Sequence, residues 1–183
     1  VRKRFGSLDV LVNCAGTSGW RPIEKIDQRF VSDIVETSLL GTLWGCAVAA
    51  PLLSKGSCII NVSSLAGKRG SANNSAYCAA KFAVNGMTQA LAKELGSKGI
   101  RVNAVCPVYV ETPELLKALG EPSAPPAGRN VKGYLREFAS TQKALGRLPT
   151  TQEVANAVWF FASPDASAIT GQCLNIDCGT LPQ

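Results

Sequence analysis

The sequence predicts an α/β protein in which helices cover both faces of a doubly wound parallel sheet. Short apolar runs rich in β-branched residues, at 8–12, 59–62 and 100–106, are long enough for strands buried on both faces. Longer segments rich in Ala, Leu, Lys and Glu lie between these runs, as expected of helices. Such alternation is typical of parallel α/β sheets, and 183 residues suit a single domain.

The first predicted strand, residues 8–12, ends in a turn from Asn13 to Gly16. The glycine is explained by a simple strand-to-loop turn, and it also suits a backbone that passes close to a ligand. In the following loop, residues 17–26, the indole of Trp20 could line a substrate pocket or could simply pack against the core.

A long helix is predicted from Asp27 to about Leu53. Asp27 is a suitable N-cap, and Ile34 falls on the inner side of the helix. Gly41 and Gly45 are one turn apart, so that another part of the backbone could approach this helix closely.

The strand at 59–62 delivers Ser64 to the carboxyl edge of the sheet, which is where open α/β sheets bind ligands. Residues 73–75 offer capping side chains, and a helix is predicted from Ser75 to about Ser97. The active chemistry of the chain is therefore expected around this strand, the loop after it and the start of this helix.

Tyr77 and Lys81 are four residues apart and share one face of that helix. A free tyrosine has a pKa near ~10, and a neighbouring ammonium should lower it. We expect Tyr77 to transfer a proton, Lys81 to lower the pKa of Tyr77, and Ser64 to hold a substrate oxygen. Read alone, a Tyr-x-x-x-Lys pattern is often accidental.

The carboxyl-terminal part of the chain is expected to return to the sheet after a segment without strand character, residues 113–148. The predicted elements are a strand at 100–106, helical turns at 114–119, a Pro-rich stretch at 121–128, a helix at 132–145, a helix at 152–162 capped by Thr150 or Thr151, and a strand at 172–176.

Composition favours a globular, cytoplasmic protein. Hydrophobic residues make up 46% of the chain and charged residues 17%, and we expect no membrane-spanning run. The net charge is +6, but the basic residues are scattered among acidic ones, so we do not expect nucleic-acid binding. The chain has no histidine, which excludes Ser-His-Asp catalysis and argues against a metal site. The seven cysteines form no Cys-x-x-Cys pair and are expected to be buried thiols.

Ser64 stands thirteen residues before Tyr77, and Tyr77 stands four before Lys81, a spacing that resembles that of the classical short-chain dehydrogenase/reductase family. Further motifs of that family occur in the right order over essentially the whole chain. They are Asn13-Cys14-Ala15-Gly16, Arg101-Val102-Asn103, Pro107 to Thr112, and Ile169-Thr170-Gly171-Gln172.

The resemblance implies a Rossmann-like fold, NAD or NADP as cofactor, a small carbonyl or alcohol substrate, and a homodimer or homotetramer. It implies that residues 113–148 form a lid over the active site. The resemblance implies that Ser64, Tyr77 and Lys81 are catalytic, with Ser38 as a fourth candidate. It also implies a set of cofactor-binding residues, namely Asn13, Ala15, Gly16, Tyr77, Lys81, Pro107, Val110 and Thr112.

Two positions depart from the family pattern. Ser38 stands where the family has an asparagine that holds a water in a proton relay, and a serine hydroxyl has a shorter reach. Val108 replaces a glycine, so the loop after Pro107 must either take another path or accept strain, because a β-branched residue disfavours a positive φ.

The resemblance does not include the family's glycine-rich nucleotide-binding turn, so we expect residues 1–183 to be the C-terminal part of such a domain. The leading hypothesis is an NAD(P)-dependent oxidoreductase. The alternatives are a catalytically inactive interaction subunit and, with less support, an epimerase or dehydratase of related fold.

Overall fold

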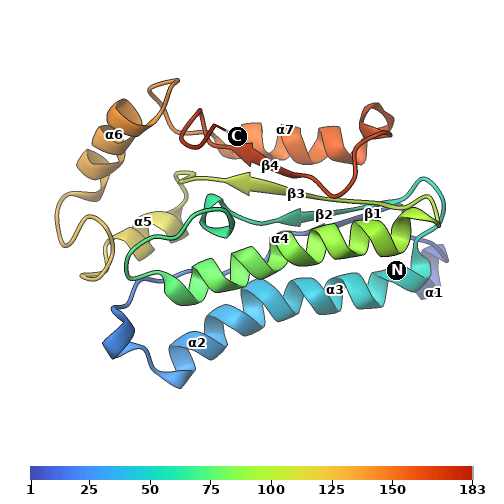
Figure 1. Cartoon of the computed structure of the whole chain (residues 1–183), viewed down its shortest axis with the longest axis horizontal. Coiled ribbons are helices and arrows are strands. Elements are labelled where there is room, and N and C mark those ends of the chain that lie inside the picture. Colours follow the sequence, from blue (N-terminus) through green and yellow to red (C-terminus); the bar gives the residue numbers. More distant parts are fainter. Residues whose placement is uncertain (183) are drawn as a thin grey trace.

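The computed structural model describes residues 1–182 and contains a four-stranded parallel sheet with strand order β1-β2-β3-β4 (Figure 1). The strands are β1 (Val10–Asn13), β2 (Cys58–Val62), β3 (Arg101–Pro107) and β4 (Cys173–Ile176). All four predicted strands are present, with bounds that shift by one or two residues at an end.

The helices lie in two layers on opposite sides of the sheet, with α3 and α4 on one side and α7 on the other (Figure 1). This confirms the predicted α/β class with both faces covered. The helices are α1 (Arg2–Phe5), α2 (Gln28–Val35), α3 (Gly41–Ala49), α4 (Ser75–Gly96), α5 (Pro113–Leu119), α6 (Val131–Gln142) and α7 (Thr151–Ala162).

The two central strands are buried on both faces because their side chains alternate between two cores. Ile59 of β2 and Val102 of β3 pack with residues of α3 and α4. Ile60 of β2 and Val105 of β3 pack against Phe161 of α7. Only an apolar run such as β2 can serve both cores.

The strand β1 is different, because it forms one edge of the sheet. It pairs with β2 alone, and the side chains of Val10 and Val12 are 38% and 41% exposed. The strand expected at 8–12 is therefore present, and the face that carries Val10 and Val12 lies open at the edge of the sheet.

The long predicted helix runs from Gln28 to Leu52, and Asp27 caps it by accepting a hydrogen bond from Phe30 N at 2.8 Å. Its middle, Glu36–Leu40, is a π-helical turn. This helix is long and apolar enough to cross a membrane, by length and mean hydropathy alone. The expectation that the chain contains no membrane-spanning run is therefore corrected. Ile34 and Cys46 of this helix are buried, whereas Trp44 and Val48 are exposed.

The start of α4 is held differently from the prediction. Asn74 is the N-cap residue, but its side chain makes no capping hydrogen bond. Asn74 Nδ2 instead donates to the Gly19 carbonyl at 2.8 Å and ties the loop after β1 to the start of α4. The helix ends near the predicted position, before Gly99, whose φ of +71° suits glycine.

Residues 113–148 carry α5 and α6, as expected of a segment outside the sheet, and share a small core with the loop after β1. This core consists of Trp20, Leu119, Ala124 and Leu135, with partly buried neighbours that include Tyr109, Tyr134 and Leu148.

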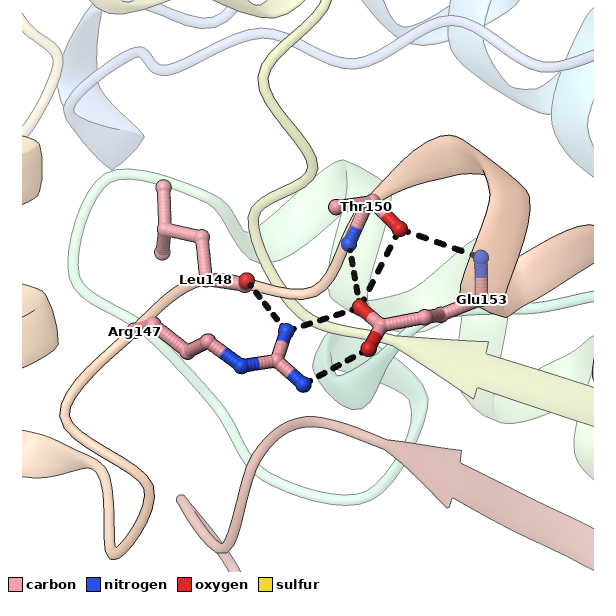
Figure 2. Close-up of polar contacts among 4 residues, drawn as sticks. All are labelled: Arg147, Leu148, Thr150 and Glu153. Carbon is pink, nitrogen blue, oxygen red and sulfur yellow. Dashed lines mark hydrogen bonds and ion pairs between the residues drawn. The ribbon is translucent and has the colours of Figure 1, made fainter.

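The connection from this segment to α7 is fixed by Arg147, Thr150 and Glu153 (Figure 2). Thr150 and Glu153 form a capping box, as the predicted cap at Thr150 requires. The guanidinium of Arg147 donates to both oxygens of Glu153, at 2.8 and 2.6 Å.

The seven cysteines are all free thiols, but they are not all buried. Cys46, Cys58, Cys78 and Cys106 are buried as expected. Cys14 is exposed, and Cys173 and Cys178 are half-buried, which corrects the expectation for these three.

Candidate active site

A cleft of about 320 Å³ opens at the carboxyl ends of β2 and β3, between the start of α4 and residues 113–148. Of the predicted site residues, Ser64, Tyr77 and Val110 line it. Its other lining residues include Trp20, Arg69, Val108, Tyr109, Tyr134 and Phe138. The cleft lies where ligands bind open α/β sheets.

Ser64 stands two residues beyond the end of β2 and begins a short 3₁₀ turn, Leu65–Gly67. Its Oγ accepts a hydrogen bond from Ala66 N at 3.1 Å, which fixes the side chain on the cleft wall. Ser64 and Tyr77 both line the cleft, and the interaction with the Ser64 side chain acts to lower the pKa of Tyr77.

Burial raises the pKa of Tyr77 above its ordinary value, and the interaction with Ser64 opposes this only in part. We expected a neighbouring ammonium to lower the pKa of Tyr77. The structure shows the opposite direction, because the loss of solvent around the phenol outweighs the favourable interactions. Tyr77 is thus a protonated phenol at neutral pH.

Lys81 lies one helical turn after Tyr77 and is only 3% exposed. Its Nζ donates to the Val62 carbonyl at 2.8 Å and lies 5.7 Å from the centroid of the Tyr77 ring. Burial lowers the pKa of Lys81 to about 8. The ammonium is still charged at pH 7 and is held rigidly behind the tyrosine.

Ser38 is fully buried in the π-helical turn. Its Oγ donates to the Thr17 carbonyl at 2.8 Å and accepts from Thr17 N at 3.0 Å. The Ser38 hydroxyl therefore anchors the loop after β1. This geometry does not support the proton-relay role that we considered for Ser38.

Gly16 lies where that loop passes the site. A Cβ built on Gly16 would lie 3.4 Å from Lys81 Nζ and 3.5 Å from Ser38 Oγ, in van der Waals contact with both groups. Ala15 lies beside it, exposed. The loop therefore leaves a small, open surface next to Lys81, as close approach of a ligand requires.

Asn13, the last residue of β1, does not reach the cleft. Its Nδ2 donates to Asn61 Oδ1 at 2.9 Å and to Cys46 Sγ at 3.3 Å, which ties β1 to β2 and α3. A Cβ on Gly45 would lie 2.4 Å from Asn13 Oδ1, so this glycine makes room for the Asn13 side chain rather than for another backbone segment as expected. Gly41 has only its own helix nearby.

On the other side of the cleft, Pro107 ends β3 and Thr112 caps α5 by accepting a hydrogen bond from Leu115 N at 3.2 Å. The positive φ angles among the described non-glycine residues are at Asn73, Ala127 and Cys178. Val108 is not one of them and its N donates to Ile176 O at 3.3 Å, so the loop takes an unstrained path.

Sequence reasoning missed the aromatic wall of the cleft. Tyr109, Tyr134 and Phe138 form a cluster with ring centroids 4.9–6.3 Å apart. Burial, the largest cause, raises the pKa of Tyr109. The spacing of four residues between Tyr134 and Phe138 on a predicted helix could have signalled a shared aromatic face.

The site residues fit the nicotinamide end of a dinucleotide. The open surface at Ala15 and Gly16 lies next to Lys81, and Val110 lines the cleft opposite Ser64 and Tyr77. Both flanks thus come from turns that follow parallel strands, the position at which such folds hold nucleotides.

Comparison with known proteins agrees with this geometry. Residues 1–180 match the family described as enoyl-(acyl carrier protein) reductase. The diacetyl reductase, (S)-acetoin forming, of Staphylococcus aureus is 38% identical over 179 residues, which cover 96% of this chain and 69% of the relative. The 3-oxoacyl-(acyl-carrier-protein) reductase FabG of Vibrio cholerae is 34% identical over 181 residues, with coverage of 98% and 69%.

Solved structures agree with the sequence comparison. The ligand-free aldohexose dehydrogenase of Thermoplasma acidophilum superposes with a TM-score of 0.88 at 32% identity and covers 100% of this chain and 74% of its own. These reductases and dehydrogenases give no support to an interaction subunit or an epimerase. The chain belongs to the short-chain dehydrogenase/reductase family, and it is an NAD(P)-dependent oxidoreductase of carbonyl and alcohol groups.

Proposed function

We propose that the complete protein reduces a small ketone, with Ser64, Tyr77 and Lys81 as its catalytic residues. The observation that supports this proposal is that Ser64 and Tyr77 line the cleft together, with the ammonium of Lys81 fixed 5.7 Å from the centroid of the Tyr77 ring.

The raised pKa of Tyr77 keeps its phenol protonated at neutral pH. A protonated phenol is ready to give its proton to the carbonyl oxygen, while oxidation needs the phenolate first. Ser64 orients the carbonyl oxygen by donating a hydrogen bond. As the proton leaves Tyr77, the charge of Lys81 stabilises the developing phenolate.

NADH or NADPH, when bound, supplies the hydride that reaches the carbonyl carbon. For this chain we propose Asn13, Ala15, Gly16, Tyr77, Lys81, Pro107, Val110 and Thr112 as the residues around its nicotinamide half. Asn13 would act by fixing the strand end, since its side chain is bonded to Asn61 and Cys46. Thr112 would act through the start of α5.

We infer a small substrate with apolar flanks. A cleft of about 320 Å³ is near the lower limit of ligand pockets, and its far wall is the aromatic cluster of Tyr109, Tyr134 and Phe138. Among the relatives, one is named for diacetyl and another for a 3-oxoacyl group. We therefore propose a small diketone or a short 3-oxoacyl thioester.

The test follows oxidation of NADH and NADPH by the complete protein in the presence of diacetyl or a 3-oxobutanoyl thioester. The proposal expects turnover with one of these, and a loss of roughly 10²-fold in kcat for Ser64→Ala. The matched control is Ser97→Ala, at the far end of α4. Equal rates for the two variants would remove Ser64 from the mechanism.

We also propose a soluble, cytoplasmic homo-oligomer. Exposed apolar side chains of α3 and α4, namely Trp44, Val48 and Phe82, are 62%, 73% and 47% exposed and suit a self-complementary contact. Lysine in place of Trp44 should lower the molar mass seen by light scattering, whereas lysine in place of Leu145, in the lid, should not.

A further inference from the structure

Arg69 gives the cleft a charge that the proposed catalytic residues do not explain. Within the described part of the chain, Arg69 is the one residue with a formal charge that lines the cleft, and no aspartate or glutamate lines it. The other lining residues are aromatic, aliphatic or uncharged and polar. A neutral ketone would therefore leave this cation without an ionic partner.

The position of Arg69 is fixed beside the reacting end of the cleft. Its backbone N donates to the Leu65 carbonyl at 3.1 Å, and Cys78 Sγ lies 4.0 Å from its carbonyl oxygen. These two contacts involve the residues that directly follow Ser64 and Tyr77 in the chain. Because the cleft measures only about 320 Å³, a substrate that reaches both hydroxyls also lies near Arg69.

The guanidinium of Arg69 is accessible to a ligand. The residue is exposed, unlike the buried Lys81. The ion pairs between described residues join Arg21 to Asp27 and Arg147 to Glu153, and neither includes Arg69. An arginine in a cleft without an acidic neighbour is suited to bind an anion.

The charge of Arg69 acts across the cleft on the lid side. Burial is the main cause that raises the pKa of Tyr109, and the charge of Arg69 opposes it. Burial is also the main cause that lowers the pKa of Lys143, and Arg69 contributes in the same direction. Both groups thus experience this cation.

A second cation stands behind the aromatic wall. Lys143 Nζ lies 5.0 Å from the centroid of the Phe138 ring, which lines the cleft. The acid beside Lys143 is Asp177, whose carboxylate accepts two backbone hydrogen bonds, at 2.9 and 2.8 Å. With Arg69 and Lys143 against one carboxylate, this end of the cleft has a net positive charge and attracts anions.

We propose that Arg69 selects a ketone that also carries a carboxylate, so that the preferred substrate of the cleft is a short oxo acid. The planar guanidinium presents its N–H groups in a fork that matches the two oxygens of a carboxylate. The ketone oxygen would bind at Ser64 and Tyr77, and the carboxylate would face Arg69. This inference rests on the proposed reduction of a small ketone and narrows its substrate class.

The test compares oxo acids with their methyl esters, which have the same ketone and no charge. We would measure kcat/KM of the complete protein, with NADH and NADPH, for 2-oxobutanoate, 3-oxobutanoate and 4-oxopentanoate and for the three esters. We expect at least one acid to exceed its ester by roughly 10- to 100-fold, the effect of hydrogen bonds to a charged group.

Three variants locate the source of this preference. Arg69→Met should remove it and leave the rates with the esters within about threefold, because Arg69 is exposed and takes no part in proton transfer. Arg69→Lys should keep part of it, because the charge remains but the fork is lost. Arg136→Met is the matched control. It removes the same charge from α6 at a separate cavity and should leave the preference intact.

Equal kcat/KM for acid and ester in all three pairs would overturn this inference, as would a preference that survives Arg69→Met. Reduction of the esters or of diacetyl would then still support the proposed function. Calorimetric titration of the protein saturated with NAD⁺ or NADP⁺ provides a measurement without turnover. An oxo acid should bind at least about tenfold more tightly than its ester, and only when Arg69 is present. Such binding in a protein that reduces no ketone would support the carboxylate site and contradict the proposed reduction, and no difference in binding would overturn the site.

Discussion

The two sides of the cleft are built in different ways. The catalytic wall, residues 58–81, is a strand and a helix start packed into the central sheet, with Ile59 and Ile60 fully buried on opposite faces. The lid, residues 113–148, packs on Trp20 and Tyr109 through a small core outside the sheet and makes polar contacts through Asn73 and Lys143.

Each side contains one buried lysine, and the contrast between them is instructive. Both Lys81 and Lys143 have a pKa lowered to about 8 by burial. Lys81 donates to the backbone of β2 and faces Tyr77. Lys143 donates to the Asp177 carbonyl and, at 3.0 Å, to Thr180 Oγ1, and so fastens the lid to the C-terminal loop. Two lysines with a similarly lowered pKa thus have different surroundings: Lys81 faces Tyr77, whereas Lys143 holds the lid in place.

The largest loss of activity is expected from a substitution in the catalytic wall. Tyr77→Phe removes only the ionisable hydroxyl, so kcat should fall by roughly 10³–10⁴-fold while the fold is kept. Steady-state kinetics with circular dichroism as a folding check would measure this. Tyr134→Phe, which removes a tyrosine hydroxyl on the lid side of the cleft, is the matched control. Turnover of Tyr77→Phe within a few-fold of the parent would exclude Tyr77 as the proton donor.

Lys81→Met should lower kcat by roughly 10²-fold, because the developing phenolate loses its cation. In the parent, kcat should decline as pH rises through about 8, where Lys81 loses its proton. Lys81→Arg stays charged and should move this decline to higher pH. Lys93→Met, near the other end of α4, is the control. A parent profile that is flat across pH 8 would argue against a charged Lys81.

The wall was largely predictable from sequence because its signals are local. An apolar run specifies β2, and the spacing of Tyr77 and Lys81 on a helix specifies their common face. The pKa of Tyr77 was predicted in the wrong direction, since the pattern shows its neighbours and not its loss of solvent.

The contacts that hold the lid could not be predicted in the same way. The hydrogen bond from Lys143 to Thr180 spans 37 residues and leaves no periodic pattern in the sequence. The bonds from Ser38 to Thr17 likewise depend on the path of the loop after β1.

The lid lysine should affect binding more than chemistry. Lys143→Met loses two hydrogen bonds that hold the C-terminal loop, so KM should rise by up to roughly tenfold while kcat stays within about twofold. Steady-state kinetics would separate the two parameters. If Lys143→Met lowered kcat as much as Lys81→Met does, Lys143 would act in the chemical step and not only in positioning the lid.

The same lysine predicts a dependence of stability on pH. The pKa of Lys143 is about 8 in the folded chain and 10.5 for an ordinary lysine, so the unfolded chain binds the proton more tightly. This opposes folding fully below pH 8, and the effect fades as pH rises toward 10.5. Relative to Lys143→Met, the parent should therefore gain stability over that range, as urea unfolding would show.

The smallest effect is expected at the junction of the lid with α7. The Arg147–Glu153 pair is solvent-exposed, with side chains 50% and 37% accessible, and such pairs contribute little. Arg147→Ala should lower Tm by less than about 4 °C, because Thr150 still caps the helix with Glu153 (Figure 2). Glu153→Ala should lower Tm further, because it removes the capping box as well.

Unfolding at low pH tests whether the Arg147–Glu153 ion pair stabilises this junction. The hydrogen bond with Arg147, the largest cause, lowers the pKa of Glu153 from its usual 4.5 to about 2. The pair should therefore stabilise the fold fully above pH 4.5 and lose its effect as pH falls toward 2. Thermal unfolding of parent and Arg147→Ala should converge over that range. A difference that persists unchanged at low pH would mean that Arg147 acts through packing and its bond to the Leu148 carbonyl rather than through Glu153.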